Sequence, residues 1–461
     1  MTQSRRRFLA ASAAAGGVSL VGVEKAVAEQ DRPRLTQHPD RELRSILREV
    51  DQCDIEAIVR KLVSFGTRHT LSSQDDPRRG IGAARDWIHA ELTRYAEPSE
   101  GRMTVETQSY IQPPADRIPV PTKISNVLAT LRGSASPERV YVVSGHYDSR
   151  VSDVMNATSD SPGADDDASG VAVAMELARV MARRKPEATI VFAAVAGEEQ
   201  GLYGARHMAK VYKAAGTDVQ AMFTNDIVGS CTADDGTRDP RTVRLFAEGV
   251  PTSETPDEAA IRRSVGGEND SPSRQLARFV REVADNSATE TNVRVIYRRD
   301  RYLRGGDHIG FLEQGYPAAR FTEPHEDFAH QHQDVRVQDG KQYGDLVEFC
   351  DFPYITKVAK VNAAALWSLA AAPGTPKGAR IRTDTLTNET DLVWQKGTEP
   401  DLAGYEVLWR ETTDSEWTHV IEVGGVTTAH VDLSKDNVFF GVRAVDRDGH
   451  RGPVAFPTPL R

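Results

Sequence analysis

The feature that most constrains the fold is an alternation of short β-branched runs with helical stretches between about residues 125 and 230. Residues 140–143 and 188–193 predict two buried strands, and residues 221–223 begin a third. Between the first two, apolar side chains at helical spacing over 171–181 predict a helix. Strands that alternate with helices form βαβ units. The sequence therefore predicts an α/β fold with a mainly parallel mixed sheet flanked by helices.

Further helical patterns surround this core and end at a domain boundary. They cover residues 41–95 and 355–369, and an Ala-Ala-Ala-Pro-Gly break follows near residue 373. Beyond it, apolar residues alternate with period two over 405–409 and 440–444, which is typical of a small all-β sandwich. We therefore expect one large domain over 29–373 and a β-sandwich over 374–461.

The first 28 residues have the pattern of an export signal. A Ser-Arg-Arg-Arg-Phe-Leu segment precedes an apolar run of about 14 residues, and Ala26-Val27-Ala28 offers a cleavage site. The run is shorter than the ~20 residues that span a bilayer. The segment resembles a bacterial twin-arginine signal, so we expect cleavage after Ala28, a periplasmic or secreted protein, and no membrane-spanning segment afterwards.

Composition excludes several classes of protein. Of the 461 residues, 39% are hydrophobic and 27% charged, as in soluble globular chains, so neither global disorder nor a polytopic membrane protein fits. A net charge of −10 argues against nucleic acid as a partner. The three cysteines, Cys53, Cys231 and Cys350, allow at most one disulfide and form no Cys-x-x-Cys metal site.

Two polar motifs lie where predicted strands end or helices begin. His146 closes the first strand, at the edge of the sheet where α/β proteins place ligand sites, and Asp148 is positioned to accept its second ring N–H. Asp165, Asp166 and Asp167 then crowd three carboxylates before the next helix. Helix capping explains one aspartate there but not three, so a cation is expected to compensate them. By composition alone, residues 159–167 predict a loop.

The remaining motifs supply further oxygen and nitrogen donors. Glu198 and Glu199 follow the second strand, and Asp226 follows the third. A His-rich stretch over 323–334 contains His330, with Asp334 four residues later, which is the pair we favour as functional. His325 and His332 are then interpreted as residues behind the ligands or on the surface. Each motif alone is weak, but together they form a mixed nitrogen and oxygen donor set that suits zinc.

Over roughly residues 55–370 the chain resembles the bimetallic zinc peptidases, which include bacterial leucyl aminopeptidases, aminopeptidase Y and, more distantly, glutamate carboxypeptidase and glutaminyl cyclase. The segments that carry the resemblance are Gly-His-Tyr-Asp-Ser at 145–149, Gly-Ala-Asp-Asp-Asp-Ala-Ser-Gly at 163–170, Gly-Glu-Glu-Gln-Gly-Leu-Tyr-Gly at 197–204, Asn-Asp at 225–226, Gly-Asp-His at 306–308 and Gly-Tyr-Pro-Ala at 315–318. His330 with Asp334 completes the pattern.

The resemblance implies a role for each motif. Asp166 is expected to bridge two zinc ions, with His146 and Asp226 at one ion and Glu199 and His330 at the other. Glu198 is the expected general base, and a cis peptide bond is expected between Asp166 and Asp167. The implied activity is a zinc-dependent aminopeptidase that hydrolyses N-terminal residues from peptides through a two-metal-activated water.

One family position differs here. Several members have a tyrosine directly before the last histidine ligand, where its hydroxyl helps the oxyanion, whereas this chain has Ala329. Tyr302, Tyr203 and His308 are candidates to replace it, and no spacing argument selects among them.

Two other functions remain open. A carboxypeptidase of the same family would use arginines of the 298–304 segment, namely Arg298, Arg299, Arg301 and Arg304, to hold a substrate carboxylate. A catalytically silent binding protein would use the C-terminal domain, whose phrases over 376–461 resemble fibronectin type III, to contact a surface or polymer. Retention of Glu198 and of every ligand-type residue favours the aminopeptidase.

Overall fold

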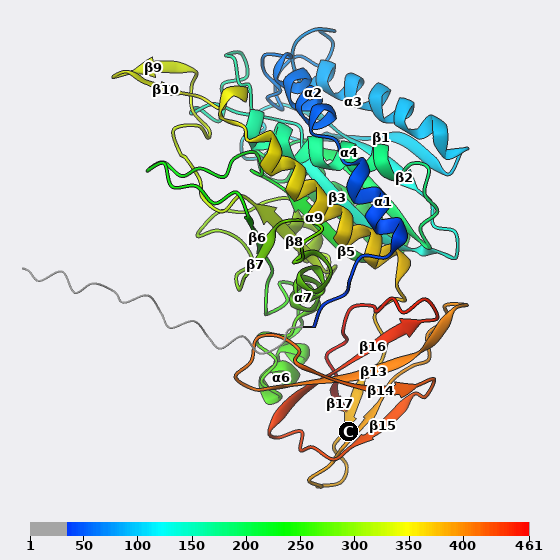
Figure 1. Ribbon diagram of the computed structural model, residues 1–461. Helices are drawn as coiled ribbons and strands as arrows, with labels where there is room; N and C mark the ends of the chain where they lie inside the picture. The colour runs from blue at the N-terminus through cyan, green and yellow to red at the C-terminus, as the bar shows by residue number, and fades with distance from the viewer. Residues whose placement is uncertain (1–34, 461) are drawn as a thin grey trace, which may run out of the picture.

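The computed structural model describes residues 35–460, and it divides into a large α/β body and a smaller β body below it (Figure 1). The predicted signal segment, residues 1–28, lies outside the described residues. Within the described chain, no helix is both long enough and apolar enough to cross a membrane. The cysteines Cys53, Cys231 and Cys350 are all free thiols.

The large body contains an eight-stranded sheet and nine α-helices among the described residues. The strands are β1 (Met103–Gln112), β2 (Thr122–Leu131), β3 (Ser136–His146), β4 (Ala188–Val195), β5 (Asp218–Asn225), β6 (Thr242–Phe246), β7 (Asn292–Ile296) and β8 (Ala318–Thr322). The helices are α1 (Arg41–Glu49), α2 (Gln52–Val63), α3 (Ile81–Ala96), α4 (Gly170–Met181), α5 (Tyr203–Ala215), α6 (Pro256–Ser264), α7 (Pro272–Ala284), α8 (His308–Leu312) and α9 (Phe352–Ala371). Short helical turns η1 (Glu97–Ser99), η2 (Ala164–Ser169) and η3 (Val347–Phe349) and a hairpin of β9 (Arg336–Gln338) and β10 (Lys341–Tyr343) complete it.

The sheet is mixed, with a parallel centre and antiparallel additions. Its order is β1-β2-β4-β3-β5-β8-β6-β7, and the central strands β4, β3, β5 and β8 all run parallel. β1 and β2 join antiparallel on one side, and β6 pairs antiparallel with β8 on the other. The predicted mainly parallel mixed sheet is therefore confirmed. Because the central strands are parallel, their carboxyl ends meet at a single edge.

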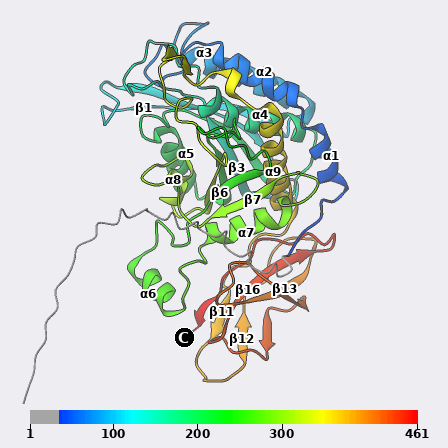
Figure 2. The same cartoon turned by 60° about the vertical axis from the view of Figure 1, so that its left-hand side comes forward.

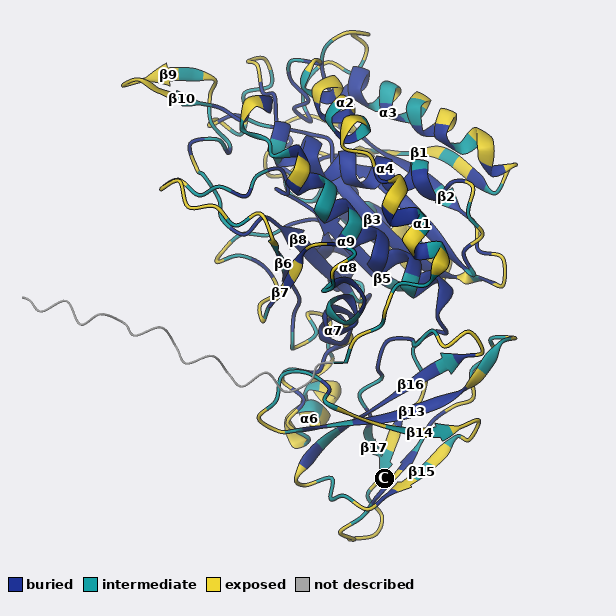
Figure 3. Ribbon diagram, in the orientation of Figure 1, coloured by how far each residue is buried: buried dark blue, intermediate teal, exposed yellow. Residues whose placement is uncertain are grey.

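Helices cover both faces of the sheet, which explains why the central strands are apolar throughout. Every residue of β4 is buried. Helices α1 to α4, α7 and α9 share one large core with one face (Figures 1 and 3). Helices α5 and α8 pack on the other face, where Met208 and Phe311 are fully buried (Figure 2).

The helical patterns of the sequence correspond to real helices. The predicted apolar face of α3 is buried at Ala84, Ile88, Leu92 and Tyr95, and α4 and α9 occupy the expected positions. The prediction of a loop over 159–167 is wrong at its end, because η2 begins at Ala164 and leads directly into α4. The expected third strand also begins earlier, at Asp218, because its first residues pair with β3.

The C-terminal body consists of two small sheets that share a core. One has the order β15-β12-β11-β17 and the other β14-β13-β16. Their strands are β11 (Arg380–Arg382), β12 (Thr390–Val393), β13 (Leu402–Glu411), β14 (His419–Gly424), β15 (Thr428–Val431), β16 (Val438–Asp446) and β17 (Thr458–Leu460). Side chains of both sheets, such as Leu392 and Val407, lie in one buried cluster. The period-two patterns correspond to β13 and β16, where Val407 pairs with Val442.

Candidate metal centre

The predicted donors gather at the carboxyl edge of the central strands. His146 is the last residue of β3, Asp226 directly follows β5, and Glu198 and Glu199 lie in the turn after β4. The turn η2 brings Asp166 over this edge, and its approach depends on Gly145. A Cβ at Gly145 would lie 2.3 Å from the backbone of Gly170, so any other residue would push η2 away from β3.

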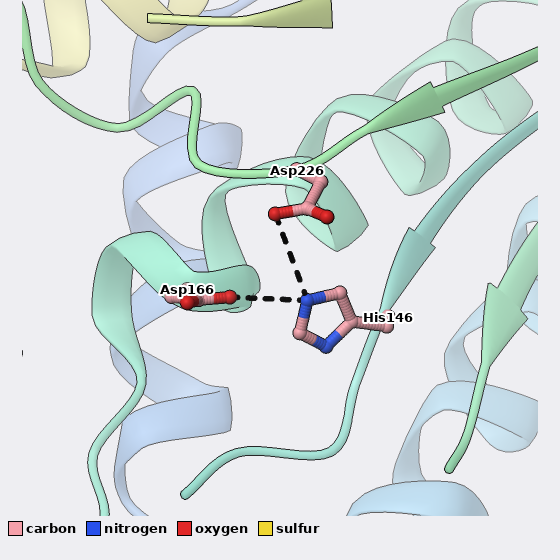
Figure 4. Close-up of side chains that lie close together, drawn as sticks. All are labelled: His146, Asp166 and Asp226. Carbon is pink, nitrogen blue, oxygen red and sulfur yellow. Dashed lines mark ion pairs between the residues drawn. The ribbon is translucent and has the colours of Figure 1, made fainter. Parts of the chain in front are cut away.

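The first donor group contains His146, Asp166 and Asp226. The Nε2 atom of His146 lies 3.0 Å from Oδ1 of Asp166 and 3.9 Å from Oδ1 of Asp226 (Figure 4). All three residues are buried. The Nδ1 atom of His146 lies 3.1 Å from the backbone carbonyl of Asp148, a contact that leaves Nε2 facing the two carboxylates.

The second donor group contains Asp166, Glu199 and His332. The Nε2 atom of His332 lies 2.7 Å from Oδ2 of Asp166 and 3.0 Å from Oε1 of Glu199. The two oxygens of Asp166 therefore face different histidines, and Asp166 belongs to both groups. This is the arrangement expected of a carboxylate between two cations.

The expectation that His330 completes this group differs from the structure. Its Nδ1 lies 3.2 Å from Oδ2 of Asp327, and its ring stacks on Phe349 at 3.4 Å between centroids. The sequence argument used the four-residue spacing between His330 and Asp334, but the segment is irregular and Asp334 is exposed. His332 has a left-handed backbone with φ of 53°, and its side chain reaches Asp166. His332, interpreted from the sequence as an outer residue, takes the position assigned to His330.

Three aspartates hold the donors in place. Asp167 accepts the backbone N–H of His146 at 2.9 Å, and the peptide bond before Asp167 is cis, as the family resemblance implies. Asp148 accepts the backbone N–H of Glu199 at 3.1 Å through its carboxylate, whose other oxygen lies 3.7 Å from Nδ1 of His146, beside the closer contact of its backbone carbonyl. Asp345, far along the sequence, accepts the N–H groups of Asp165 and Asp166 at 2.8 Å each.

The surroundings of Glu198 and Asp226 shift the pKa values of these two carboxylates in opposite directions. Burial raises the pKa of Glu198 well above its usual range. Burial has the same effect on Asp226, but the charge of Arg320 and the contacts of His146 together outweigh it and lower the pKa of Asp226 to about 2. Burial opposes charging of His146, yet the charge of Asp167 and nearby carboxylates raise its pKa well above the usual value. The histidine proton thus substitutes for part of the positive charge that these carboxylates require.

Two arginines at the site were missed in the sequence. Arg320 is fully buried, and its Nη2 lies 2.7 Å from Oδ1 of Asp226. The sequence feature that could have indicated Arg320 is a charged residue in the middle of the buried strand β8. Arg150 lies with Nε 3.0 Å from Oε2 of Glu199. It follows the His-x-Asp motif by two residues, but nothing in that spacing marks it as a contact of Glu199.

Several of the buried side-chain atoms that have no hydrogen-bond partner in the described part of the chain lie at this site. They include both carboxylate oxygens of Asp307, and also Nε2 of His146 and Oε1 of Glu199, whose 3.0 Å contacts to Asp166 and His332 lack hydrogen-bond geometry. Unpartnered buried polar atoms are costly unless a ligand satisfies them. His146 and Glu199 each belong to one of the two donor groups, so the donor set fits cations that bind nitrogen and oxygen.

Asp307 is a further carboxylate near the site that belongs to neither donor group. It belongs to the segment that connects β7 to β8, and its side chain is fully buried. Burial raises its pKa to about 7. The charge of Asp307 contributes to the raised pKa of Glu198. The charge of His146 lowers the pKa of Asp307, and the charge of Asp226 raises it. The Gly306 before it lies against Asp226, since a Cβ there would be 3.1 Å from Oδ2 of that residue. Asp307 is therefore a buried carboxylate beside the metal centre whose oxygens have no hydrogen-bond partner among the described residues.

Tyr203, Tyr302 and His308, the candidates for stabilising the oxyanion, differ in their contacts. With His332 in the histidine position, the residue before it is Gln331 rather than Ala329. The Tyr203 hydroxyl donates to the carbonyl of Asp116 at 2.9 Å, and Tyr302 is 76% exposed. His308 is buried with Nε2 directed at the carbonyl of Arg299 and Nδ1 unpartnered.

Comparison with known proteins identifies relatives that align with most of the chain. Residues 126–339 match the model of peptidase family M28. The chain is 58% identical over 421 residues to a protein of Leptosphaeria maculans named "Probable zinc metalloprotease", covering 91% of this chain and 98% of that one. A protein of the same name from Pyrenophora tritici-repentis is 56% identical, covering 92% and 88%.

Among solved structures, the LapA aminopeptidase of Legionella pneumophila has the same fold. It matches with a TM-score of 0.51 at 18% identity, over 75% of this chain and 78% of that one. At this identity the likeness concerns the fold alone. The two fungal relatives, which align along nearly the full length, show the family: this chain is a member of peptidase family M28.

Proposed function

We propose that the protein is an exported zinc-dependent aminopeptidase, with two zinc ions per chain, that removes N-terminal residues from peptides. The peptidase part rests on the family and on two donor groups that share Asp166 beside Glu198. The observation that carries the choice of an aminopeptidase is Asp307, a fully buried carboxylate whose two oxygens lack partners.

His146, Asp166 and Asp226 would hold one zinc ion, and Asp166, Glu199 and His332 the other. Zinc bound in such a site supplies Lewis acid chemistry, which lowers the pKa of a water and polarises the scissile carbonyl. The unpartnered atoms of His146 and Glu199 support this assignment, because a cation satisfies both.

Glu198 is proposed as the general base. It lies in the turn after β4, and its backbone N–H donates to Oδ1 of Asp148 at 3.3 Å, which fixes this turn. Burial raises its pKa above the usual range of a carboxyl group, and a more basic carboxylate is suited to take a proton from water and return it to the leaving amine. Glu199, one residue on, faces His332 instead, so the two adjacent carboxylates perform different tasks.

Asp307 is proposed to bind the α-ammonium group of the substrate. A buried carboxylate without partners is well stabilised by a cation that donates several hydrogen bonds. A peptide with a free N-terminus brings such a group, whereas an N-acylated peptide does not. The carboxypeptidase alternative is less favoured, since two of its four arginines, Arg301 and Arg304, already pair with Glu326 at 3.2 and 2.7 Å.

The test is hydrolysis of leucine p-nitroanilide beside its N-acetyl counterpart by the zinc-loaded protein. We expect cleavage of the free-amine substrate only. Equal cleavage of both would contradict the aminopeptidase assignment, and no cleavage of either would favour a carboxypeptidase or a silent binding protein.

A substitution of Glu198 provides the matching test of mechanism. Glu198→Gln should lower kcat by about 100- to 10,000-fold, the usual contribution of a general base, while zinc content per chain stays unchanged. Zinc is measured after dialysis by elemental analysis. A Glu198→Gln protein with normal turnover would remove Glu198 from this role.

We also propose that residues 1–28 direct export and that the fibronectin-like C-terminal domain, residues 374–461, contacts a surface or polymer. The twin-arginine pattern supports bacterial export, whereas the two curated relatives named above are fungal. N-terminal sequencing of the protein recovered outside a bacterial host cytoplasm should begin at residue 29. Recovery with residue 1 intact would contradict the signal.

A further inference from the structure

A second feature near the metal centre is a hollow of about 590 Å³ with an unusual number of cationic side chains. Five arginines line it, namely Arg206, Arg298, Arg299, Arg301 and Arg304. Its acidic lining residues are Asp300 and Glu313. A cationic hollow on a chain with a net charge of −10 requires an explanation.

The hollow adjoins the proposed catalytic groups through two of its lining residues. The backbone N–H of Leu202 donates to the carbonyl of Glu198 at 2.9 Å. The carbonyl of Gly305 accepts from Arg320 at 2.8 Å, and Arg320 pairs with Asp226. A peptide held at Glu198 and Asp226 is therefore within reach of this hollow.

Three of the arginines already have carboxylate partners. Arg206 pairs with Glu313 at 2.9 Å. Arg301 and Arg304 both approach Glu326, whose side chain is 8% exposed and also pairs with Arg244 at 3.1 Å. These arginines mainly serve the structure, and their positive charge is largely compensated.

Arg298 and Arg299 differ from these three. Both are exposed, and within residues 35–460 neither forms an ion pair with an acidic side chain. The Arg298 guanidinium lies over the ring of Tyr302 at 4.9 Å, which limits its motion without neutralising it. The loop also presents Leu303, 97% exposed, at the same hollow.

We propose that Arg298 and Arg299 bind a carboxylate of the peptide substrate, so that the enzyme prefers substrates with an acidic group near the cleaved bond. The inference rests on the proposed peptidase function and adds its substrate class. Guanidinium groups bind carboxylates through paired hydrogen bonds, and two exposed arginines without an ion pair at one hollow favour an anion over a neutral or cationic side chain. The carboxylate can belong to an acidic side chain or to the C-terminus of a short peptide.

The test compares four peptides that differ in the place of one carboxylate. Leu-Ala-Ala-amide is the neutral reference, and Glu-Ala-Ala-amide, Leu-Ala-Glu-amide and Leu-Ala-Ala with a free C-terminus each carry one carboxylate. For at least one acidic peptide we expect kcat/KM to exceed the reference about fivefold or more, mainly through KM, and to approach it in high salt. The preferred peptide identifies the source of the carboxylate.

The double variant Arg298→Gln/Arg299→Gln should remove this preference and leave kcat/KM for the neutral peptide unchanged. The matched control is Arg294→Gln, an exposed arginine on β7 outside the hollow, which should retain the preference. A preference that survives in the double variant, or no preference for any acidic peptide, would overturn the inference while leaving the aminopeptidase intact. Failure of the wild type on all four peptides would instead contradict the proposed function.

Discussion

Two clusters of buried charge among the described residues are satisfied in different ways. One is the metal centre, and the other joins α7 to the C-terminal sandwich. In the second, Asp270 is only 5% exposed and accepts from Arg278 at 2.7 Å, from Gln275 at 3.0 Å and through both oxygens from Arg410 at 2.7 and 2.9 Å. A buried charge with this many partners is stabilised by the protein alone.

The junction repeats this arrangement on a neighbouring strand. Arg443 of β16 binds Glu406 at 2.6 Å within the sandwich and Glu282 of α7 at 2.8 Å. Trp417 adds a hydrogen bond from its indole N–H to Gln275 at 2.9 Å. The carboxylates of Asp270, Glu282 and Glu406 each have an arginine partner, so the junction needs no ligand. It fixes the sandwich on α7 instead of leaving it on a loose tether.

The metal centre lacks this balance. It gathers His146, Asp166, Glu199, Asp226 and His332 with one arginine behind Asp226 and one beside Glu199, and several of its polar atoms have no hydrogen-bond partner. The difference teaches that burial of charge alone does not mark a functional site in this fold. The informative sign is a buried charge whose partners are missing.

The largest expected effect comes from breaking the unbalanced cluster. His332→Ala should lower kcat/KM by about 1,000-fold or more, because loss of a ligand removes several kcal/mol of transition-state stabilisation. Zinc content after dialysis should also fall below two per chain. The measurement is elemental analysis of the dialysed protein beside its kinetics.

His330→Ala is the matched control for this substitution. His330 lies two residues away and contacts Asp327 and Phe349, so its loss should leave zinc content unchanged and affect activity only slightly. Should His330→Ala lose zinc and His332→Ala retain it, the assignment from the structure would be wrong and the original sequence prediction correct.

Substitutions in the cluster around Asp270 should lower the stability of the protein and leave its catalytic activity unaffected. Asp270→Ala leaves Arg278 and Arg410 without their buried partner, which should lower the free energy of unfolding by about 3–5 kcal/mol. Urea unfolding at constant zinc measures this. Asp384→Asn, at an exposed position of the sandwich, should change it by less than about 0.5 kcal/mol. Equal effects of both variants would show that the junction contributes nothing special.

The sequence predicted the parts of the fold that depend on local pattern. Strand and helix positions at β3, β4, α4 and α9 follow from periodicity, and the donors at strand ends follow from the meeting of parallel strands at one edge. These inferences use short stretches of chain and a general rule of sheet geometry, so they needed no knowledge of long-range contacts.

The remaining features depend on contacts that no local pattern encodes. The choice between His330 and His332 is made by the backbone conformation of an irregular loop, which the four-residue spacing between His330 and Asp334 does not encode. Asp345 reaches the backbone of Asp165 from 180 residues away. The missing partners of Asp307 become visible only when every neighbour is placed.

The smallest expected effect concerns a pH-dependent contact at the edge of the junction. His450 bonds Asp446 of β16 through Nδ1 at 2.8 Å and lies 3.4 Å through Nε2 from Asp40, the N-cap of α1. The hydrogen bonds to Asp40 and Asp446 raise the pKa of His450 from 6.5 to about 10. The protonated form therefore ties the sandwich to the start of the large body.

Because the folded pKa lies above the unfolded one, the contribution of His450 is complete below pH 6.5 and disappears as the pH rises through about 10. His450→Gln should cost about 1 kcal/mol at pH 6 and little above pH 10. Thermal unfolding at the two pH values measures this difference against His430→Gln, whose partner Asp391 is exposed and which should cost little at either pH. A loss for His450→Gln that does not change with pH would mean that its packing matters and its charge does not, and the balance of charges at the junction would then rest on Asp270 and Arg443 alone.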